Sequence, residues 1–136
     1  MKRRKAREYA LQILFQADFT EKKINSRDLE EFWLDKKYAK NTREFAEEII
    51  HGTLSRLDEI DKMIEKFTEN WILKRMAAVD RNILRFATYE ILYRKDIPSA
   101  VTINEAIEIA KKYSSKESAP FINGILDRLA KEADKA

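Results

Sequence analysis

Five cationic side chains lie within the first seven residues of this chain: Lys2, Arg3, Arg4, Lys5 and Arg7. No acidic residue interrupts them, whereas the rest of the chain carries more acidic than basic residues. On a helix, the three arginines would share one side. A guanidinium group binds phosphate as a two-pronged donor and stacks on bases, so this basic tip predicts a polyanionic partner. The alternative is a solvated tail that only keeps the protein in solution.

A second basic group, formed by Lys111, Lys112 and Lys116, precedes the aromatic residue Phe121. If Phe121 is exposed, its ring can stack on a base while the lysines bind phosphates. Two simpler interpretations stay open. Cations near the end of a helix complement its dipole, and Phe121 would then be an ordinary core aromatic.

Residues that would indicate an enzyme are sparse. The one histidine, His51, and Glu47 one turn before it supply at most two metal ligands, and the chain has no cysteine. Its two glycines are far apart, which excludes a glycine-rich phosphate-binding loop. Carboxylate pairs are expected on the solvated faces of a chain with 24 acidic residues. The sequence therefore predicts a non-enzymatic protein with no cofactor and no metal.

Helical periodicity positions these side chains. Apolar residues recur every three or four positions, no segment alternates with period two, and glycine and proline are rare. We predict an all-α fold of about seven helices, near residues 4–19, 26–38, 41–67, 71–78, 80–94, 102–113 and 120–131. Gly52 inside the third of these indicates that another helix approaches it closely.

Capping residues mark where the predicted helices begin. Ser26 and Asp80 are of the types that favour an N-cap. Two pairs have the spacing of a capping box, in which side chains and backbone N–H groups bond reciprocally: Asn41 with Glu44, and Thr102 with Glu105.

The length of 136 residues predicts a single domain over residues 1–136. A polar stretch near residues 68–80 would divide it into an N-terminal helical subdomain, about 1–70, and a C-terminal one, about 71–136. No apolar run approaches the roughly 20 residues that cross a bilayer, and no apolar signal-peptide core follows the basic tip. We expect a cytoplasmic protein.

Four segments in order resemble the NusB family of bacterial transcription antitermination factors, from one end of the chain to the other. They are AREYALQ at 6–12 with Phe15, VDRNILR at 79–85 with Tyr89 and Glu90, residues 98–110 containing INEA, and FINGILD at 121–127. The resemblance implies two packed helical subdomains. It also implies that the protein pairs with NusE, a protein of the small ribosomal subunit, and binds the single-stranded boxA element of nascent RNA. With NusA and NusG, such a pair modifies RNA polymerase so that termination signals are bypassed, notably in ribosomal RNA operons.

The resemblance also assigns roles to particular residues. The implied RNA-binding residues are Arg3, Arg4, Lys5 and Arg7 at the basic tip, and Lys112, Lys116, Glu117 and Phe121 around the start of the last helix. The implied NusE-binding residues are Asp80, Arg81, Leu84 and Tyr89. Pro120 departs from the family pattern, because it removes a backbone donor and a possible cation beside Phe121.

Three alternatives remain at the level of the sequence. Some proteins of this family form homodimers that cover the RNA surface. NusB-like domains also precede some RNA methyltransferases, but the chain lacks the α/β domain that such enzymes need. A helical protein-interaction module with an incidental basic tip is the third alternative.

Overall fold

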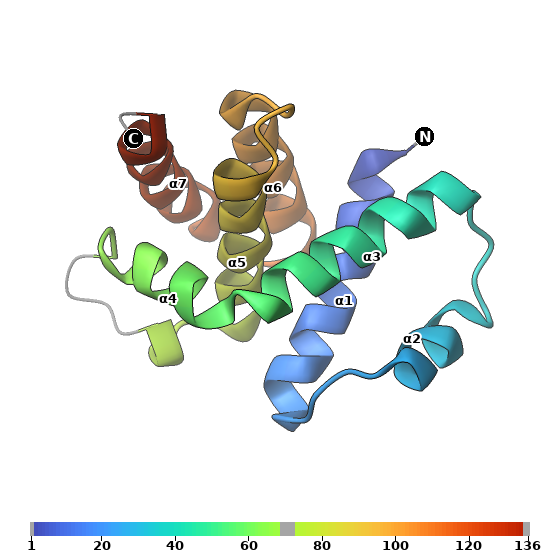
Figure 1. Cartoon of the computed structure of the whole chain (residues 1–136). Coiled ribbons are helices and arrows are strands. Elements are labelled where there is room, and N and C mark those ends of the chain that lie inside the picture. The colour runs from blue at the N-terminus through green and yellow to red at the C-terminus, as the bar shows by residue number, and fades with distance from the viewer. Residues whose placement is uncertain (1, 69–72, 135–136) are drawn as a thin grey trace.

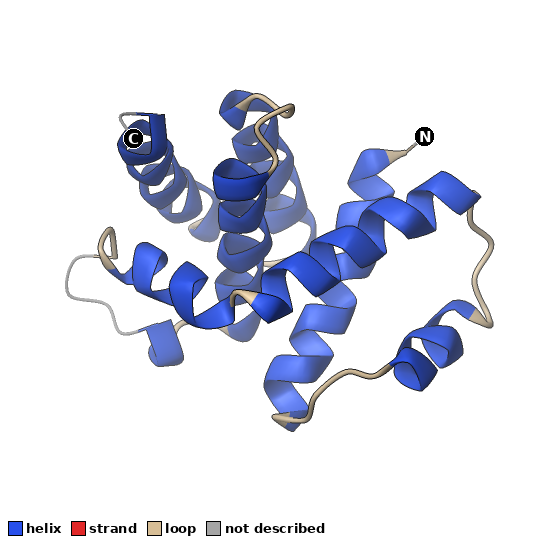
Figure 2. Ribbon diagram, in the orientation of Figure 1, coloured by secondary structure: helices blue, strands red, loops and turns tan. Residues whose placement is uncertain are grey.

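The computed structural model describes residues 2–68 and 73–134, and this part of the chain contains only helices and their connections (Figure 1 and Figure 2). The predicted all-α fold is confirmed. The seven α-helices and one 3₁₀ helix are α1 (Arg3–Thr20), α2 (Ser26–Trp33), α3 (Lys40–Ser55), α4 (Leu57–Glu65), η1 (Leu73–Arg75), α5 (Ala78–Tyr93), α6 (Ser99–Tyr113) and α7 (Ser118–Asp134). Trp71, at the start of the short helix predicted at 71–78, lies outside the described residues.

Helix α5 is the centre of the fold. It packs against α1, α3, α4, α6 and α7, and most of its residues are buried. In Figure 1, α5 is seen between α7 and α6, while α1 and α3 cross each other in the right half of the view. The buried apolar side chains form one cluster that extends from Ala6 to Ala133. The predicted subdomain boundary near residue 70 stays a prediction, since this core is continuous across it.

The predicted helix at 41–67 is divided at Arg56, whose backbone leaves helical geometry with φ −123° and ψ 26°. The change of direction turns α4 so that Ile60 and Ile64 are completely buried, and α4 packs against both α5 and α7. No glycine or proline marks this break in the sequence. The close approach predicted at Gly52 is confirmed, because the ring of Tyr89 on α5 fills the space that a side chain there would need.

Several predicted caps are wrong. Helix α2 is capped by Asn25, which forms a reciprocal capping box with Asp28, so Ser26 is already its first residue. Helices α3, α5 and α6 begin after Ala39, Ala77 and Pro98, none of which supplies a side-chain cap. These helices therefore begin before the predicted capping residues Asn41, Asp80 and Thr102. Asp80 and Thr102 form hydrogen bonds to side chains of other helices or connectors instead.

No helix within residues 2–68 and 73–134 is both long enough and apolar enough to cross a membrane.

Candidate nucleic-acid interface

Arg4 is the residue of the basic tip that faces both solvent and α6. Its guanidinium donates through Nε and Nη2 to the carboxylate of Glu105, and its side chain is 50% exposed. The hydrogen bond to Glu105 raises the pKa of Arg4. The first helix therefore begins against α6, with a charged group at the junction that remains open to solvent.

Arg7 corrects the expectation that the whole tip contacts RNA. Its guanidinium is buried and donates through Nε and Nη2 to Glu90 on α5, each at 2.7 Å, and the hydroxyl of Thr102 donates to the same carboxylate. Only 1% of the residue is exposed, so phosphate cannot reach it. Arg7 holds α1 against α5 and α6, because a charge at this depth is stable only with a full set of partners.

The remaining cations of the tip differ in how far they are exposed. Arg3 is partly buried, and its guanidinium lies 4.6 Å from the centre of the Phe45 ring on α3. Lys2 and Lys5 are exposed, and the Nζ of Lys5 lies 5.0 Å from the centre of the Tyr9 ring. The three arginines do share one side of α1, as their spacing indicated, because Arg7 lies against both Glu105, which Arg4 also contacts, and the Phe45 ring beside Arg3. That side faces the rest of the protein, and Arg4 is the most exposed of the three.

The end of α6 meets the start of α1 over a pocket of about 350 Å³, lined by Arg4, Glu8, Glu108, Ile109, Lys111 and Lys112. Lys112 donates to Glu8 at 2.9 Å, and the hydroxyl of Tyr113 donates to the same carboxylate. Burial opposes the charge on Glu8, but the hydrogen bonds from Tyr113 and Lys112 outweigh it and lower the pKa of this carboxyl. Residues more than 100 positions apart thus form one charged surface.

Phe121 lies beside a second pocket, of about 330 Å³, between the start of α7 and the loop before α5. The ring is partly buried, and Glu117 and Asp80 line the same pocket. Asp80 accepts hydrogen bonds from the hydroxyls of Ser114, at 2.6 Å, and Ser118, at 2.8 Å. These bonds fix the connector between α6 and α7, which carries exposed Lys116 and Glu117.

The predicted partner surface on α5 is contradicted by burial. Leu84 is completely buried, and Tyr89 is 6% exposed with its hydroxyl donating to Glu48. Arg81 is held by Asp18 on α1 and by backbone carbonyl groups from 73 to 76. Asp80 belongs to the Phe121 pocket. A helix at the centre of the fold has little surface to offer a second protein.

An exposed aromatic pair on α1, Phe15 and Phe19, was not predicted from the sequence. Phe15 is 37% exposed and Phe19 is 79% exposed, and their rings stack with centres 6.3 Å apart. The signal was present in the spacing of four residues, which places both rings on one side of a helix. Large apolar side chains gathered on a surface mark a site of protein contact.

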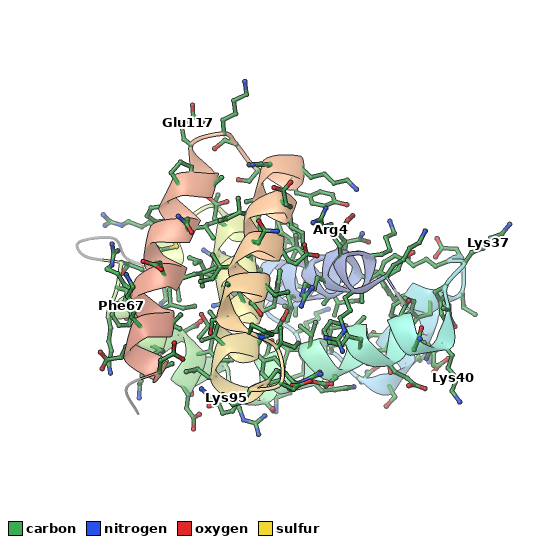
Figure 3. All side chains as sticks on the ribbon, turned by 90° about the horizontal axis from the view of Figure 1, so that it is seen from above. Arg4, Lys37, Lys40, Phe67, Lys95 and Glu117 are labelled. Atoms are coloured by element: carbon green, nitrogen blue, oxygen red, sulfur yellow. The ribbon has the colours of Figure 1, made fainter. Side chains whose placement is uncertain are left out.

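The connector between α6 and α7 links the two pockets, since Lys111 and Lys112 line one and Glu117, Ser118 and Phe121 line the other. In Figure 3, Arg4 lies between Glu117 at one end and Lys37 and Lys40 at the other. Among the predicted RNA-binding residues, Arg4, Lys5, Lys112, Lys116 and Glu117 are exposed and Phe121 is partly buried, whereas Arg7 is in the core and Arg3 is turned toward Phe45. Exposed cations beside an aromatic ring are what single-stranded nucleic acid requires.

A sequence model of the NusB family matches residues 4–131 of this chain. The chain belongs to the NusB family. The transcription antitermination protein NusB of Thermodesulfovibrio yellowstonii is 54% identical, over 97% of this chain and 93% of its own. The NusB protein of Bacillus subtilis is 43% identical over the full length of both chains.

Solved NusB structures share the fold. NusB of T. maritima superposes with a TM-score of 0.88 at 48% identity, covering 97% of this chain and 92% of its own. A complex of the antitermination factors NusB and NusE with double-stranded RNA contains a chain that superposes with a TM-score of 0.85 at 25% identity, covering 97% of this chain and 99% of that one. The resemblance seen in the four sequence segments is therefore confirmed.

Proposed function

We propose that the protein is a non-enzymatic transcription antitermination factor that binds the single-stranded boxA element of nascent RNA together with NusE, in the cytoplasm. One observation carries the proposal: Arg4 and Lys112, from opposite ends of the sequence, line one solvent-open pocket. Exposed Lys116 and the Phe121 ring follow on the connector after α6 and at the start of α7. Membership of the NusB family, and the NusB–NusE–RNA complex with the same fold, support the proposal.

The two parts of this surface would have different tasks. Arg4, Lys5, Lys112 and Lys116 bind phosphates, which supplies affinity that is independent of sequence. Phe121 stacks on an unstacked base, and the carboxylate of Glu117 accepts a hydrogen bond from a base amino group. Unpaired bases are available for such contacts in a single strand but not in a duplex, which favours single-stranded RNA as the ligand.

The partner surface is proposed anew, because the α5 residues are buried. We assign NusE binding to the stacked pair Phe15 and Phe19 on α1, which is exposed and apolar. RNA and NusE would then occupy separate surfaces of α1. With NusA and NusG, the resulting complex would act on RNA polymerase to bypass termination signals in ribosomal RNA operons.

The test is binding of labelled boxA RNA, measured by fluorescence anisotropy with and without NusE. Arg4→Ala combined with Lys112→Ala should weaken binding at least tenfold and lower the salt slope by about 1.4, since each phosphate on a single strand contributes about 0.7. Lys62→Ala, an exposed lysine on α4, is the control and should change neither. The same sequence as a duplex should bind more weakly.

Unchanged affinity in the double variant would refute the assigned RNA surface. Binding to NusE without any binding to RNA would instead favour the protein-interaction module.

A further inference from the structure

A third pocket lies on the opposite side of the α1 start from the Arg4–Lys112 pocket. It has a volume of about 660 Å³ and is lined by Lys2, Lys5, Tyr9, Lys37, Tyr38, Ala39, Asn41 and Thr42. We call it the α1–α3 pocket. Three lysines and two tyrosines line it, and no acidic side chain does. Its composition is therefore that of a site for an anion that carries a flat ring.

The lysines of the α1–α3 pocket keep their charge available. Within residues 2–68 and 73–134, Lys2, Lys5 and Lys37 form no ion pair, whereas Arg4 and Lys112 are each paired with a carboxylate. The neighbouring Lys36 is not available in this way, because it donates hydrogen bonds to Asp35 and to a backbone carbonyl group. An unneutralised group of exposed ammonium ions attracts phosphate more strongly than one that is already paired.

Tyr38 is held as a fixed ring at the edge of the α1–α3 pocket. Its hydroxyl accepts a hydrogen bond from Arg43 at 2.9 Å, and its ring lies 4.8 Å from that of Trp33, centre to centre. Arg43 in turn donates to Glu47, at 2.9 Å, and to Glu30. Yet 38% of Tyr38 remains exposed. A ring that is fixed in advance loses little entropy when a base stacks on it.

The charges on the outer side of Tyr38 are mixed. Glu44 and Glu47 line the adjoining hollow together with Lys36, Lys37, Lys40 and Arg43. The carboxylate of Glu47 accepts hydrogen bonds from Arg43 and Trp33, and the Oε1 of Glu44 lies 3.9 Å from the Nζ of Lys40. Lys36 and Arg43 are also paired, with Asp35 and Glu30, so Lys37 is the only one of these four cations without an ion pair in the described residues. The attraction for an anionic strand is therefore stronger on the side of the Tyr38 ring that faces the α1–α3 pocket.

The α1–α3 pocket is continuous with the proposed RNA surface. Arg4 and Lys5 are neighbours on α1, and they line the pockets on its two sides. In Figure 3, Arg4 separates Glu117 from the Lys37 end of the molecule. A strand that contacts Phe121 and Arg4 would reach Lys37 and Tyr38 by crossing the start of α1.

We propose that the α1–α3 pocket is a second RNA subsite, which binds nucleotides that flank boxA on the same strand. This inference rests on the proposed function. Lys2, Lys5 and Lys37 contact phosphates and Tyr38 stacks on a base, so the subsite tolerates any sequence. It would lengthen the RNA footprint without adding sequence specificity.

The test compares a minimal boxA RNA with two longer ones, carrying six uridines at the 5′ or the 3′ end, by fluorescence anisotropy on the full chain with NusE. One of the longer RNAs should bind the unaltered protein about tenfold more tightly. Lys37→Ala with Tyr38→Ala should abolish that gain and leave the minimal RNA unaffected. The matched control is Lys62→Ala with Tyr93→Ala, because Tyr93 is also 38% exposed and lies on α5.

Lys37→Glu is a second variant, chosen in case the double variant does not fold. Lys37 is exposed, so the substitution should leave the fold intact, and the reversed charge should also abolish the gain in affinity for the longer RNA. Equal affinity for all three RNAs would overturn the second subsite while leaving the proposed function intact. The second subsite would also be overturned if the Lys37 and Tyr38 variants lost equal affinity for the minimal and the longer RNAs, or if they lost only NusE binding. Failure of every RNA to bind would refute the proposed function itself.

Discussion

The guanidinium of Arg7 and the carboxylate of Glu90 form a two-pronged ion pair inside the protein, with both nitrogen–oxygen distances at 2.7 Å. Neither side chain is more than 2% exposed. Glu90 also accepts a hydrogen bond from Thr102, at 3.0 Å, so α1, α5 and α6 meet at one carboxylate. This pair connects the basic tip to the core and fixes where the exposed cations of α1 lie.

Replacing Arg7 with alanine should destabilise the fold severely. The charge on Glu90 would remain buried without its partner, which costs about 3–5 kcal/mol of the free energy of unfolding. Urea denaturation followed by circular dichroism measures the loss. Arg4→Ala is the control, since Arg4 is half exposed and should lower stability far less. Equal losses for the two variants would contradict the role assigned to Arg7.

The two glycines of the chain should respond to alanine in opposite directions. At Gly52 a methyl group would collide with the Tyr89 ring, and overpacking of this kind costs about 1–3 kcal/mol. At Gly124 the nearest atom to a new methyl group is the Nη1 of Arg128, 3.7 Å away, so Gly124→Ala should stabilise α7 by up to about 1 kcal/mol. Thermal denaturation of both variants tests the prediction, and a stabilised Gly52→Ala protein would exclude the close contact.

Glu8 should make stability depend on pH in the acidic range. Its pKa is lowered in the folded protein, so it contributes stability above its unfolded value of 4.5 that is lost as the pH falls through the folded pKa. Glu8→Gln should flatten this decline in urea titrations between about pH 5 and pH 3. Glu132→Gln, at an exposed position, is the control. A profile for Glu8→Gln that declines as steeply as that of the unaltered protein would rule out the effect.

The exposed aromatic pair should matter to protein contact and not to RNA contact. Phe15→Ala with Phe19→Ala should weaken NusE binding at least tenfold, as expected when aromatic anchors leave an interface. Isothermal calorimetry measures this, and RNA binding in the absence of NusE should not change. Val101→Ala removes an exposed apolar side chain on α6 and should have no effect. If the double variant retained its full affinity for NusE, the interface would lie elsewhere on the protein.

Periodicity was sufficient to predict the helices, because apolar stripes at a spacing of three or four residues determine which segments can cover a core. It could not predict the division at Arg56, which carries no proline or glycine and depends on α4 turning to pack against α5 and α7. It also misplaced caps. Asp80 is a frequent capping residue type, but here Ser114 and Ser118, more than 30 residues later, donate to it.

The candidate site was predicted less completely than the fold, for a related reason. Within the basic tip, Arg4 and Arg7 look alike, and only the position of Glu90, 83 residues away, makes Arg7 structural. Family resemblance pointed to the Phe121 region and Lys112, whose role in RNA binding stays a prediction. It gave no indication that Leu84 and Tyr89 are buried, because a motif records residue types and not their orientation.

Glu105 and Glu8 give the RNA surface one further property. In the free protein these carboxylates form ion pairs with Arg4 and Lys112, and in the complex RNA phosphates would bind the same two cations. Binding is therefore an exchange of one anion for another. We expect neutralisation of either carboxylate to tighten RNA binding, because it frees the cation in the unbound protein and removes a negative charge beside the phosphates in the complex. The affinity of such a protein can be adjusted from residues that bind no phosphate themselves.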